Sequence, residues 1–144
     1  MFLIFVNDLP DWVANNILMF ADDTKIWART SNTEDSKLLQ DDLDKLVEWS
    51  KKWLLKFNPE KCKVMHVGHG RRTEYFLEDN GITHRLQEVS SEKELGVLTT
   101  SNLKPSLQRV RSAEKATSVL RMVNRSFKNL NKKNFLTVYH MFTR

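Results

Sequence analysis

The chain has 144 residues, with 23 Lys and Arg against 18 Asp and Glu, which gives a formal net charge of +5. Its length suits one compact domain, and three Pro with four Gly exclude a collagen-like or Pro/Gly-rich disordered chain. The single cysteine, Cys62, excludes an intrachain disulfide framework. We expect a chain of the nucleus or cytoplasm that is not secreted. No apolar run reaches the roughly 20 residues of a membrane helix, so no membrane partner is expected.

The charge is distributed unevenly along the chain. Residues 1–70 carry nine basic and eleven acidic side chains, whereas residues 71–144 carry fourteen basic and seven acidic ones. The last 41 residues, 104–144, hold ten basic side chains and one acid, Glu114. This asymmetry predicts a polyanionic partner for the C-terminal part, nucleic acid being the commonest, although a solvated helix face would have the same composition.

The first third of the chain predicts a short helix and a hairpin. Residues 1–6 are apolar, and the helix predicted over residues 1–9 stops before Pro10, which disfavours helical geometry at the residue before it. Two apolar runs, 17–21 and 26–28, flank Asp22-Asp23-Thr24. This pattern predicts a tight β-hairpin with the acidic pair at its tip.

A long amphipathic helix is predicted next. Ser31 and Glu34 have the spacing of a capping box, and Asn58-Pro59 marks the end of the helical region. Trp49 and Trp53 are four residues apart, which indicates core packing. The other apolar positions at helical spacing are Leu39, Leu43, Leu46, Val47 and Leu54.

The second half predicts short strands followed by helices. Residues 63–67 form a strand candidate, and Asn80-Gly81 is a strong hairpin signal within residues 74–86. Gly96 lies inside the apolar run 95–98 and suggests close backbone approach or a bulge. A helix from Pro105 to about Phe127 precedes a last helix that begins near residue 131. Hairpins followed by helices without βαβ alternation predict an α+β fold.

The acidic pair at the predicted hairpin tip has two interpretations. Asp is a common turn residue, so Asp22 and Asp23 would be structural if taken alone. An apolar hairpin that holds two like charges at one exposed point, however, is relieved by a cation. Carboxylate oxygens suit a hard cation such as Mg²⁺, and the pattern therefore predicts a divalent metal at the tip.

Phe20-Ala21-Asp22-Asp23-Thr24 resembles the central metal-binding motif of reverse transcriptases. Four further segments resemble parts of the non-long-terminal-repeat (LINE-type) retrotransposon polymerases, in the same order. Residues 1–10 resemble the helix after the substrate-selecting loop. Residues 46–68 carry a Phe-Asn-x-x-Lys-Cys signature from Phe57 to Cys62, and residues 93–106 resemble the primer-grip segment. Residues 115–127 resemble a thumb helix.

The resemblance implies part of an RNA-directed DNA polymerase. Residues 1–103 would be a partial palm, with an acidic-tipped hairpin, a packed helix and short antiparallel strands, and residues 104–144 the beginning of a basic helical thumb. The implied reaction is two-metal nucleotidyl transfer to a primer 3′-hydroxyl with Mg²⁺. The implied partners are an RNA template, a DNA primer and, in the parent enzyme, a deoxynucleotide.

The resemblance also implies roles for individual residues. Asp22 and Asp23 would be catalytic metal ligands, and Lys61 would stabilise or protonate the leaving group. Phe20 and Ala21 would lie under the primer terminus. The primer-grip turn would contain Gly96.

The family pattern is incomplete in this sequence. A further aspartate from an earlier strand, the substrate-selecting loop and the nucleotide-binding fingers lie upstream of the region that matches residue 1. Neither Asp8 nor Asp11 stands in the motif of that aspartate. We therefore expect that the isolated chain does not polymerise, and that another polypeptide would have to supply the missing segments.

The helix predicted over residues 105–127 has two unlike faces on a helical wheel. One face is apolar and predicted to pack: Ala116, Val119, Leu120, Val123 and Phe127. The other is cationic and, together with Lys104, predicted to bind nucleic acid: Arg111, Lys115, Arg121, Arg125 and Lys128.

Two other classes of function fit the same sequence. The chain would be a non-catalytic nucleic-acid-binding module if the carboxylates affect no activity. It would be a degenerate retroelement remnant if it folds poorly, because an apolar hairpin without a flanking strand is an aggregation hazard.

Overall fold

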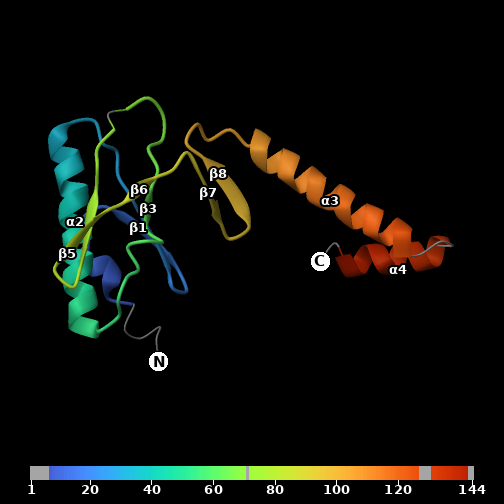
Figure 1. The fold of residues 1–144 in the computed structure, drawn as a ribbon, viewed down its shortest axis with the longest axis horizontal. Helices are drawn as coiled ribbons and strands as arrows, with labels where there is room; N and C mark the ends of the chain where they lie inside the picture. Colours follow the sequence, from blue (N-terminus) through green and yellow to red (C-terminus); the bar gives the residue numbers. More distant parts are fainter. Residues whose placement is uncertain (1–6, 71, 127–130, 143–144) are drawn as a thin grey trace. The chain divides into compact units, whose positions relative to one another are not determined.

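The computed structural model describes residues 7–70, 72–126 and 131–142, and it combines three helices and a short 3₁₀ helix with small two-stranded sheets among these residues (Figure 1). Internal contacts divide the chain into two compact units, Met1–Ser91 and Glu92–Arg144. The predicted palm and thumb boundary after residue 103 concerns function rather than packing and stays a prediction. The two units are described separately below.

The first described element is the 3₁₀ helix η1, Leu9–Trp12. Pro10 is its second residue, where the missing N–H of proline costs no hydrogen bond. Leu9 is buried, and the indole Nε1 of Trp49 donates a hydrogen bond to Asp8 Oδ1 at 2.8 Å. Most of the helix predicted over residues 1–9 lies outside the described residues.

The predicted hairpin is confirmed. Strand β1, Asn16–Phe20, pairs with β2, Asp23–Trp27, in antiparallel register, so that Ile17 faces Ile26 and Phe20 faces Asp23. Ala21-Asp22 is the two-residue loop. Asp23 therefore begins the second strand instead of lying wholly within the turn.

Helix α2, Thr33–Trp53, begins one residue later than its predicted capping box. Asn32 has extended backbone and accepts a hydrogen bond from the backbone N–H of Asp35 at 2.7 Å. The Asp35 carboxylate accepts in return from the backbone N–H of Asn32 at 3.3 Å. The helix ends at Trp53, and the next residue, Leu54, has a φ of 56° that turns its side chain off the helix, so this predicted core position is 86% exposed.

Two apolar clusters pack against α2 and form the core of the first unit. Leu9, Leu46 and Trp49 make one cluster, with the inward residues of the β1–β2 hairpin against it. Val47, Tyr75, Leu77 and Leu86 make the other. Leu43 and Phe57 pack against both clusters. The prediction that Trp49 belongs to the core is confirmed.

Short strands complete the first unit. Strand β4, Phe76–Asp79, and β5, Ile82–Arg85, form the hairpin that Asn80-Gly81 predicted, and both turn residues have positive φ. Strand β3, Lys63–Val64, is shorter than predicted and pairs in parallel with β6, Gln87–Glu88.

The second unit joins a small hairpin to two helices. Strand β7, Ser91–Glu94, at the boundary of the units, pairs with β8, Val97–Thr100. Helix α3, Ser106–Ser126, and α4, Lys132–Phe142, confirm both predicted C-terminal helices. Gln108 of α3 accepts a hydrogen bond from the backbone N–H of Leu98 at 2.8 Å, which joins the helix to the hairpin. No helix among the described residues combines the length and the apolar character that crossing a membrane requires.

Candidate functional site

The acidic tip of the β1–β2 hairpin presents both predicted metal ligands to solvent. Asp22 is the second loop residue and Asp23 the first residue of β2, and both are exposed. The first loop residue, Ala21, has a φ of 54°, in the left-handed region that a two-residue hairpin loop requires and that favours glycine. The tip is thus a tight turn built on an unfavourable residue.

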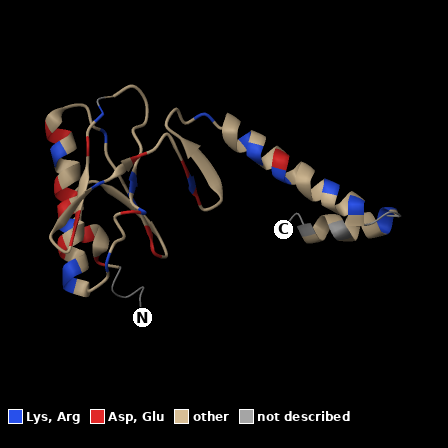
Figure 2. Cartoon of the chain, in the orientation of Figure 1, with Lys and Arg blue, Asp and Glu red and all other residues tan. Residues whose placement is uncertain are grey.

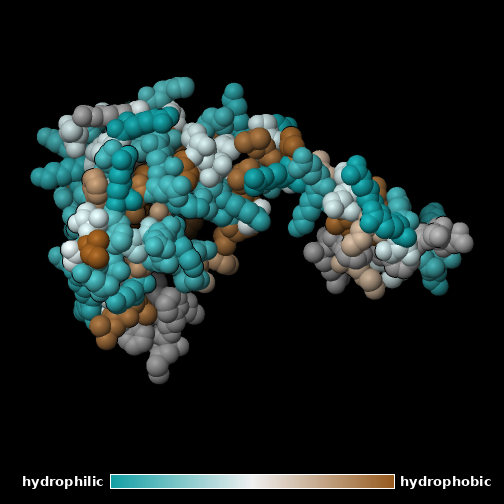
Figure 3. All heavy atoms as spheres, in the orientation of Figure 1, coloured by the Kyte–Doolittle hydropathy of each residue, from teal (hydrophilic) through white to brown (hydrophobic). Residues whose placement is uncertain are grey.

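The hairpin has one packed and one exposed face. Ile17, Met19 and Ile26 pack against the cluster on α2. On the other face Leu18 and Phe20 are each 60% exposed and Trp27 is 45% exposed. Figure 3 shows hydrophobic residues in brown among hydrophilic residues in teal on one side of the molecule. Directly opposed residues share a face, so the exposed face also carries Asp23, opposite Phe20. The structure therefore places Phe20, Ala21 and both aspartates at the exposed end of the hairpin, and their roles at a metal or a primer terminus stay predictions.

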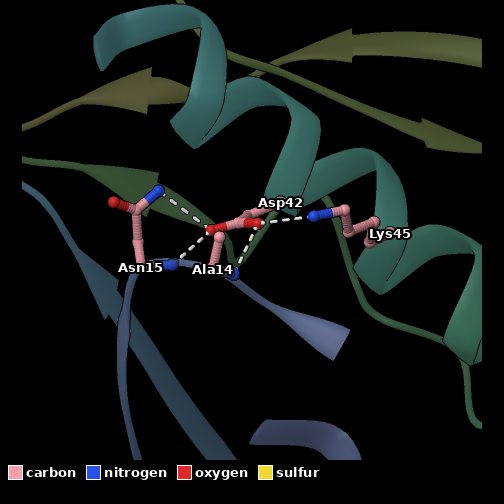
Figure 4. A network of polar contacts seen from close by, with 4 residues as sticks. All are labelled: Ala14, Asn15, Asp42 and Lys45. Carbon is pink, nitrogen blue, oxygen red and sulfur yellow. Dashed lines mark hydrogen bonds and ion pairs between the residues drawn. The ribbon is translucent and has the colours of Figure 1, made fainter. Parts of the chain in front are cut away.

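A buried carboxylate on α2, that of Asp42, accepts hydrogen bonds from Ala14 and Asn15 (Figure 4). These two residues precede β1 at the end of the hairpin away from its tip, and we call them the root of the hairpin. Asp42 is fully buried, and its Oδ1 accepts from the backbone N–H of Ala14 at 2.9 Å. Its Oδ2 accepts from the backbone N–H and the side-chain Nδ2 of Asn15, at 2.8 and 2.9 Å. Lys45 Nζ lies 3.3 Å from Oδ1.

Burial alone would raise the pKa of Asp42, but the hydrogen bonds from Ala14, Asn15 and Lys45 outweigh it and lower the pKa below its ordinary value. The role of Asp42 was not predicted from the sequence. Its signal was an acid at helical spacing among the apolar positions Leu39 and Leu46, where a solvated charge would not be expected.

Lys61 lies in the turn between α2 and β3. Asn58 organises this turn, since its side chain accepts from the backbone N–H of Glu60 at 3.0 Å and its carbonyl from that of Lys61 at 3.1 Å. Phe57 joins the two core clusters, and the half-buried Cys62 packs beside one of them. Burial raises the pKa of the Cys62 thiol. The Phe-Asn-x-x-Lys-Cys segment is therefore built by packing and turn geometry that leave Lys61 exposed.

In the part of the chain that the structure describes, no third metal-ligating side chain joins Asp22 and Asp23. Among the described residues, no group of three or more His, Cys, Asp or Glu side chains is placed to hold a metal ion. The structure records no ion pair between Lys61 and either aspartate within the described part of the chain.

Gly96 lies in the two-residue turn between β7 and β8. Leu95 and Gly96 have φ values of 48° and 84°, the combination of a type I′ turn. A Cβ added at Gly96 would meet no atom within 4 Å, so the expectation of close backbone approach or a bulge is wrong for the described residues. The glycine satisfies the backbone of a turn, and its role in a primer grip stays a prediction.

The cationic face of α3 is exposed as predicted. Figure 2 shows blue Lys and Arg positions repeated along the ribbon of this helix, and Glu114 is its acidic residue. The exposed members are Lys104, Arg111, Lys115, Arg121 and Arg125, whereas Lys128 lies outside the described residues.

The opposite face of α3 differs from its prediction. Val123 is buried and Val119 half-buried, but Ala116 is exposed and Leu120 is 50% exposed. Phe127 lies outside the described residues. A two-stranded sheet and a short helix offer too little apolar surface to cover a helix of 21 residues.

Comparisons with known proteins bear on the whole chain. Neither the curated proteins nor the solved structures gave a match. The family model described as "Reverse transcriptase (RNA-dependent DNA polymerase)" matches residues 1–130, which include the acidic hairpin, α2, the β7–β8 turn and α3. The chain belongs to the reverse transcriptase family.

Proposed function

We propose that the chain is part of a LINE-type reverse transcriptase, reaching from the palm to the start of the thumb. The observation that carries this proposal is the tight β1–β2 hairpin with Asp22 and Asp23 exposed at its tip, in a chain of the reverse transcriptase family. The subfamily rests on the order of the motifs in the sequence.

The tip suits magnesium by the chemistry of its donors. Asp22 and Asp23 offer carboxylate oxygens, the ligands that Mg²⁺ prefers, and their exposure leaves room for water and phosphate oxygens to complete the coordination. Bound magnesium supplies the positive charge that activates a primer hydroxyl and neutralises a triphosphate. The protein's own part is to hold two carboxylates at a fixed point beside Phe20, whose exposed ring is available to a primer terminus.

The cationic face of α3 would bind the phosphates of a template–primer duplex. Four basic side chains of this face, between Arg111 and Arg125, are exposed on one helix. Contacts of this kind with phosphates supply most of the affinity for nucleic acid that does not depend on sequence. In this proposal the exposed β7–β8 turn and Lys104 belong to the same nucleic-acid-binding unit.

The isolated chain is proposed not to extend primers. The family uses a further aspartate, and no segment of the printed sequence matches its motif. Purified chain, incubated with Mg²⁺, an RNA template, a DNA primer and deoxynucleotides, should give no extension product. Extension that Asp22→Asn abolishes would contradict this part of the proposal.

Duplex binding tests the proposed function without requiring catalysis. We expect the chain to bind an RNA–DNA hybrid with an affinity that falls steeply between about 50 and 200 mM salt. Arg121→Gln combined with Arg125→Gln should weaken binding. The slope of log K against the logarithm of the salt concentration should fall in magnitude by up to about two, because each arginine would contact one phosphate. The matched control is Arg29→Gln combined with Lys37→Gln, which removes the same charge from exposed positions of the first unit. Equal losses from both double variants would show attraction by net charge alone.

A degenerate remnant is the second candidate function class, and one observation favours it. Leu18, Phe20 and Trp27 expose apolar side chains on the same face of the hairpin as Asp23, and uncovered apolar surface favours aggregation. A chain that aggregates without a cooperative unfolding transition would support the remnant and overturn the nucleic-acid-binding proposal.

A further inference from the structure

Asp42 is an unusual residue to find inside a small core. It is fully buried, whereas an ionised carboxylate is costly to bury unless hydrogen bonds and charges compensate it. It lies on α2, on a different element from the exposed acidic tip. The role proposed above for the tip does not account for it.

Its hydrogen bonds converge on one short segment. Three of its four donors belong to Ala14 and Asn15, the two residues immediately before β1, and each carboxylate oxygen accepts from at least one of them (Figure 4). The fourth donor, Lys45, comes from the next turn of α2. Both carboxylate oxygens of Asp42 thus accept hydrogen bonds from the root of the hairpin.

These hydrogen bonds differ from the apolar packing between the hairpin and α2. Ile17, Met19 and Ile26 pack on α2 through apolar surface, which is not directional. Charge-assisted hydrogen bonds of 2.8–2.9 Å are directional and short. They fix where β1 starts, and the two-residue loop with Asp22 follows only five residues after that start.

We propose that Asp42 is a positioning residue that fixes the root of the β1–β2 hairpin and thereby the place at which Asp22 and Asp23 are held. The inference rests on the proposed function of the tip. Asp42 itself touches no reacting group in this proposal.

Residue-resolved amide hydrogen exchange on the full chain tests the positioning. Asp42→Asn should lower the protection of the β1–β2 amides by about tenfold or more beyond any loss in the β4–β5 hairpin. Asp41→Asn is the matched control, with the same chemistry at the neighbouring position. Leu86→Ala is the control for lost stability, since Leu86 belongs to the core cluster that the β1–β2 hairpin does not join. Equal loss of protection in both hairpins of Asp42→Asn would overturn the proposal.

Manganese, used as a paramagnetic probe, tests the consequence at the tip. Mn²⁺ should broaden the amide signals of residues 21–24 in the unmodified chain, and this broadening should need several-fold more Mn²⁺ in Asp42→Asn but not in Asp41→Asn or Leu86→Ala. An unchanged Mn²⁺ affinity in Asp42→Asn would overturn the positioning role.

The failure of the underlying metal proposal is distinguishable. If the unmodified chain shows no tip broadening that Asp22→Asn removes, the metal site fails, while hydrogen exchange still decides whether Asp42 fixes the hairpin.

A milder variant keeps the proposal testable if Asp42→Asn does not fold. Asn15→Ala removes one donor, the side-chain Nδ2 at 2.9 Å from Asp42 Oδ2, and leaves the carboxylate in place. It should loosen the β1–β2 hairpin selectively, by a smaller factor. A uniform loss across both hairpins would again overturn the proposal.

Discussion

At the scale of single residues, the acidic hairpin combines an unfavourable turn residue with a strongly anchored root. Ala21 adopts a φ of 54° at the tip, and Asp42 holds Ala14 and Asn15 at the root. Each of these features has its own measurable effect on stability.

Ala21→Gly should stabilise the first unit by about 1 kcal/mol, because glycine adopts left-handed backbone without a Cβ clash. The free energy of unfolding from a denaturant titration measures the change. Ala28→Gly is the control, since Ala28 does not have a positive φ and the same substitution there should destabilise. An unchanged or lower stability of Ala21→Gly would show that the turn is not strained.

Asp42→Asn should destabilise the first unit by about 2–3 kcal/mol near neutral pH, because buried donors lose a charged acceptor. The pKa of Asp42 in the folded chain lies below its ordinary value of 3.8. Its contribution to stability is therefore present above about pH 5 and is lost as the pH falls through the folded pKa.

The difference in the free energy of unfolding between the unmodified chain and Asp42→Asn should shrink as the medium is acidified from about pH 5 to pH 2. A pH-independent difference would mean that the ionised form of Asp42 does not carry the stabilisation.

At the scale of elements, short-range signals were predictable and long-range pairings were not. Asn80-Gly81 specified its hairpin because both residues accept the positive φ of the turn. The parallel pairing of β3 with β6 joins residues 24 apart through two-residue strands, which leave no periodic pattern in the sequence.

In the candidate site, too, the short-range features were predictable from the sequence and the long-range ones were not. The hairpin and its acidic tip were predictable because strands, loop and carboxylates are contiguous. The anchoring by Asp42 was not, since its partners on the β1 side lie 27 and 28 positions away and only the fold brings them together. The apolar neighbours of Gly96 suggested close backbone approach or a bulge, because an apolar run gives no sign of a turn that depends on two positive φ values.

The start of α2 supplies a test of element boundaries. Asn32→Ala should destabilise the first unit by about 1 kcal/mol, because the N-cap side chain satisfies the backbone N–H of Asp35. Ser31→Ala, at the position that the sequence suggested for the cap, should have a much smaller effect. The midpoints of thermal unfolding compare the two. A larger effect at Ser31 would show that Ser31, rather than Asn32, caps the helix.

At the scale of the whole molecule, the two units differ in what they offer. The first holds both apolar clusters on α2 and the acidic hairpin. The second holds the cationic face of α3 and exposes much of its apolar surface, including Leu107, Val110 and Leu120. The carboxylates of the hairpin tip and the cationic face of α3 therefore belong to different units, and the division into palm and thumb stays a proposal.

Thermal unfolding of the full chain with and without an RNA–DNA hybrid and Mg²⁺ is the most direct test of the proposal that this chain retains a polymerase-like nucleic-acid-binding structure. We predict a cooperative transition that the hybrid raises, by about 2.7 kcal/mol of added stability at a hundredfold excess over Kd. Arg121→Gln combined with Arg125→Gln should reduce that shift. The absence of a cooperative transition, or a transition that the hybrid does not move, would contradict the account.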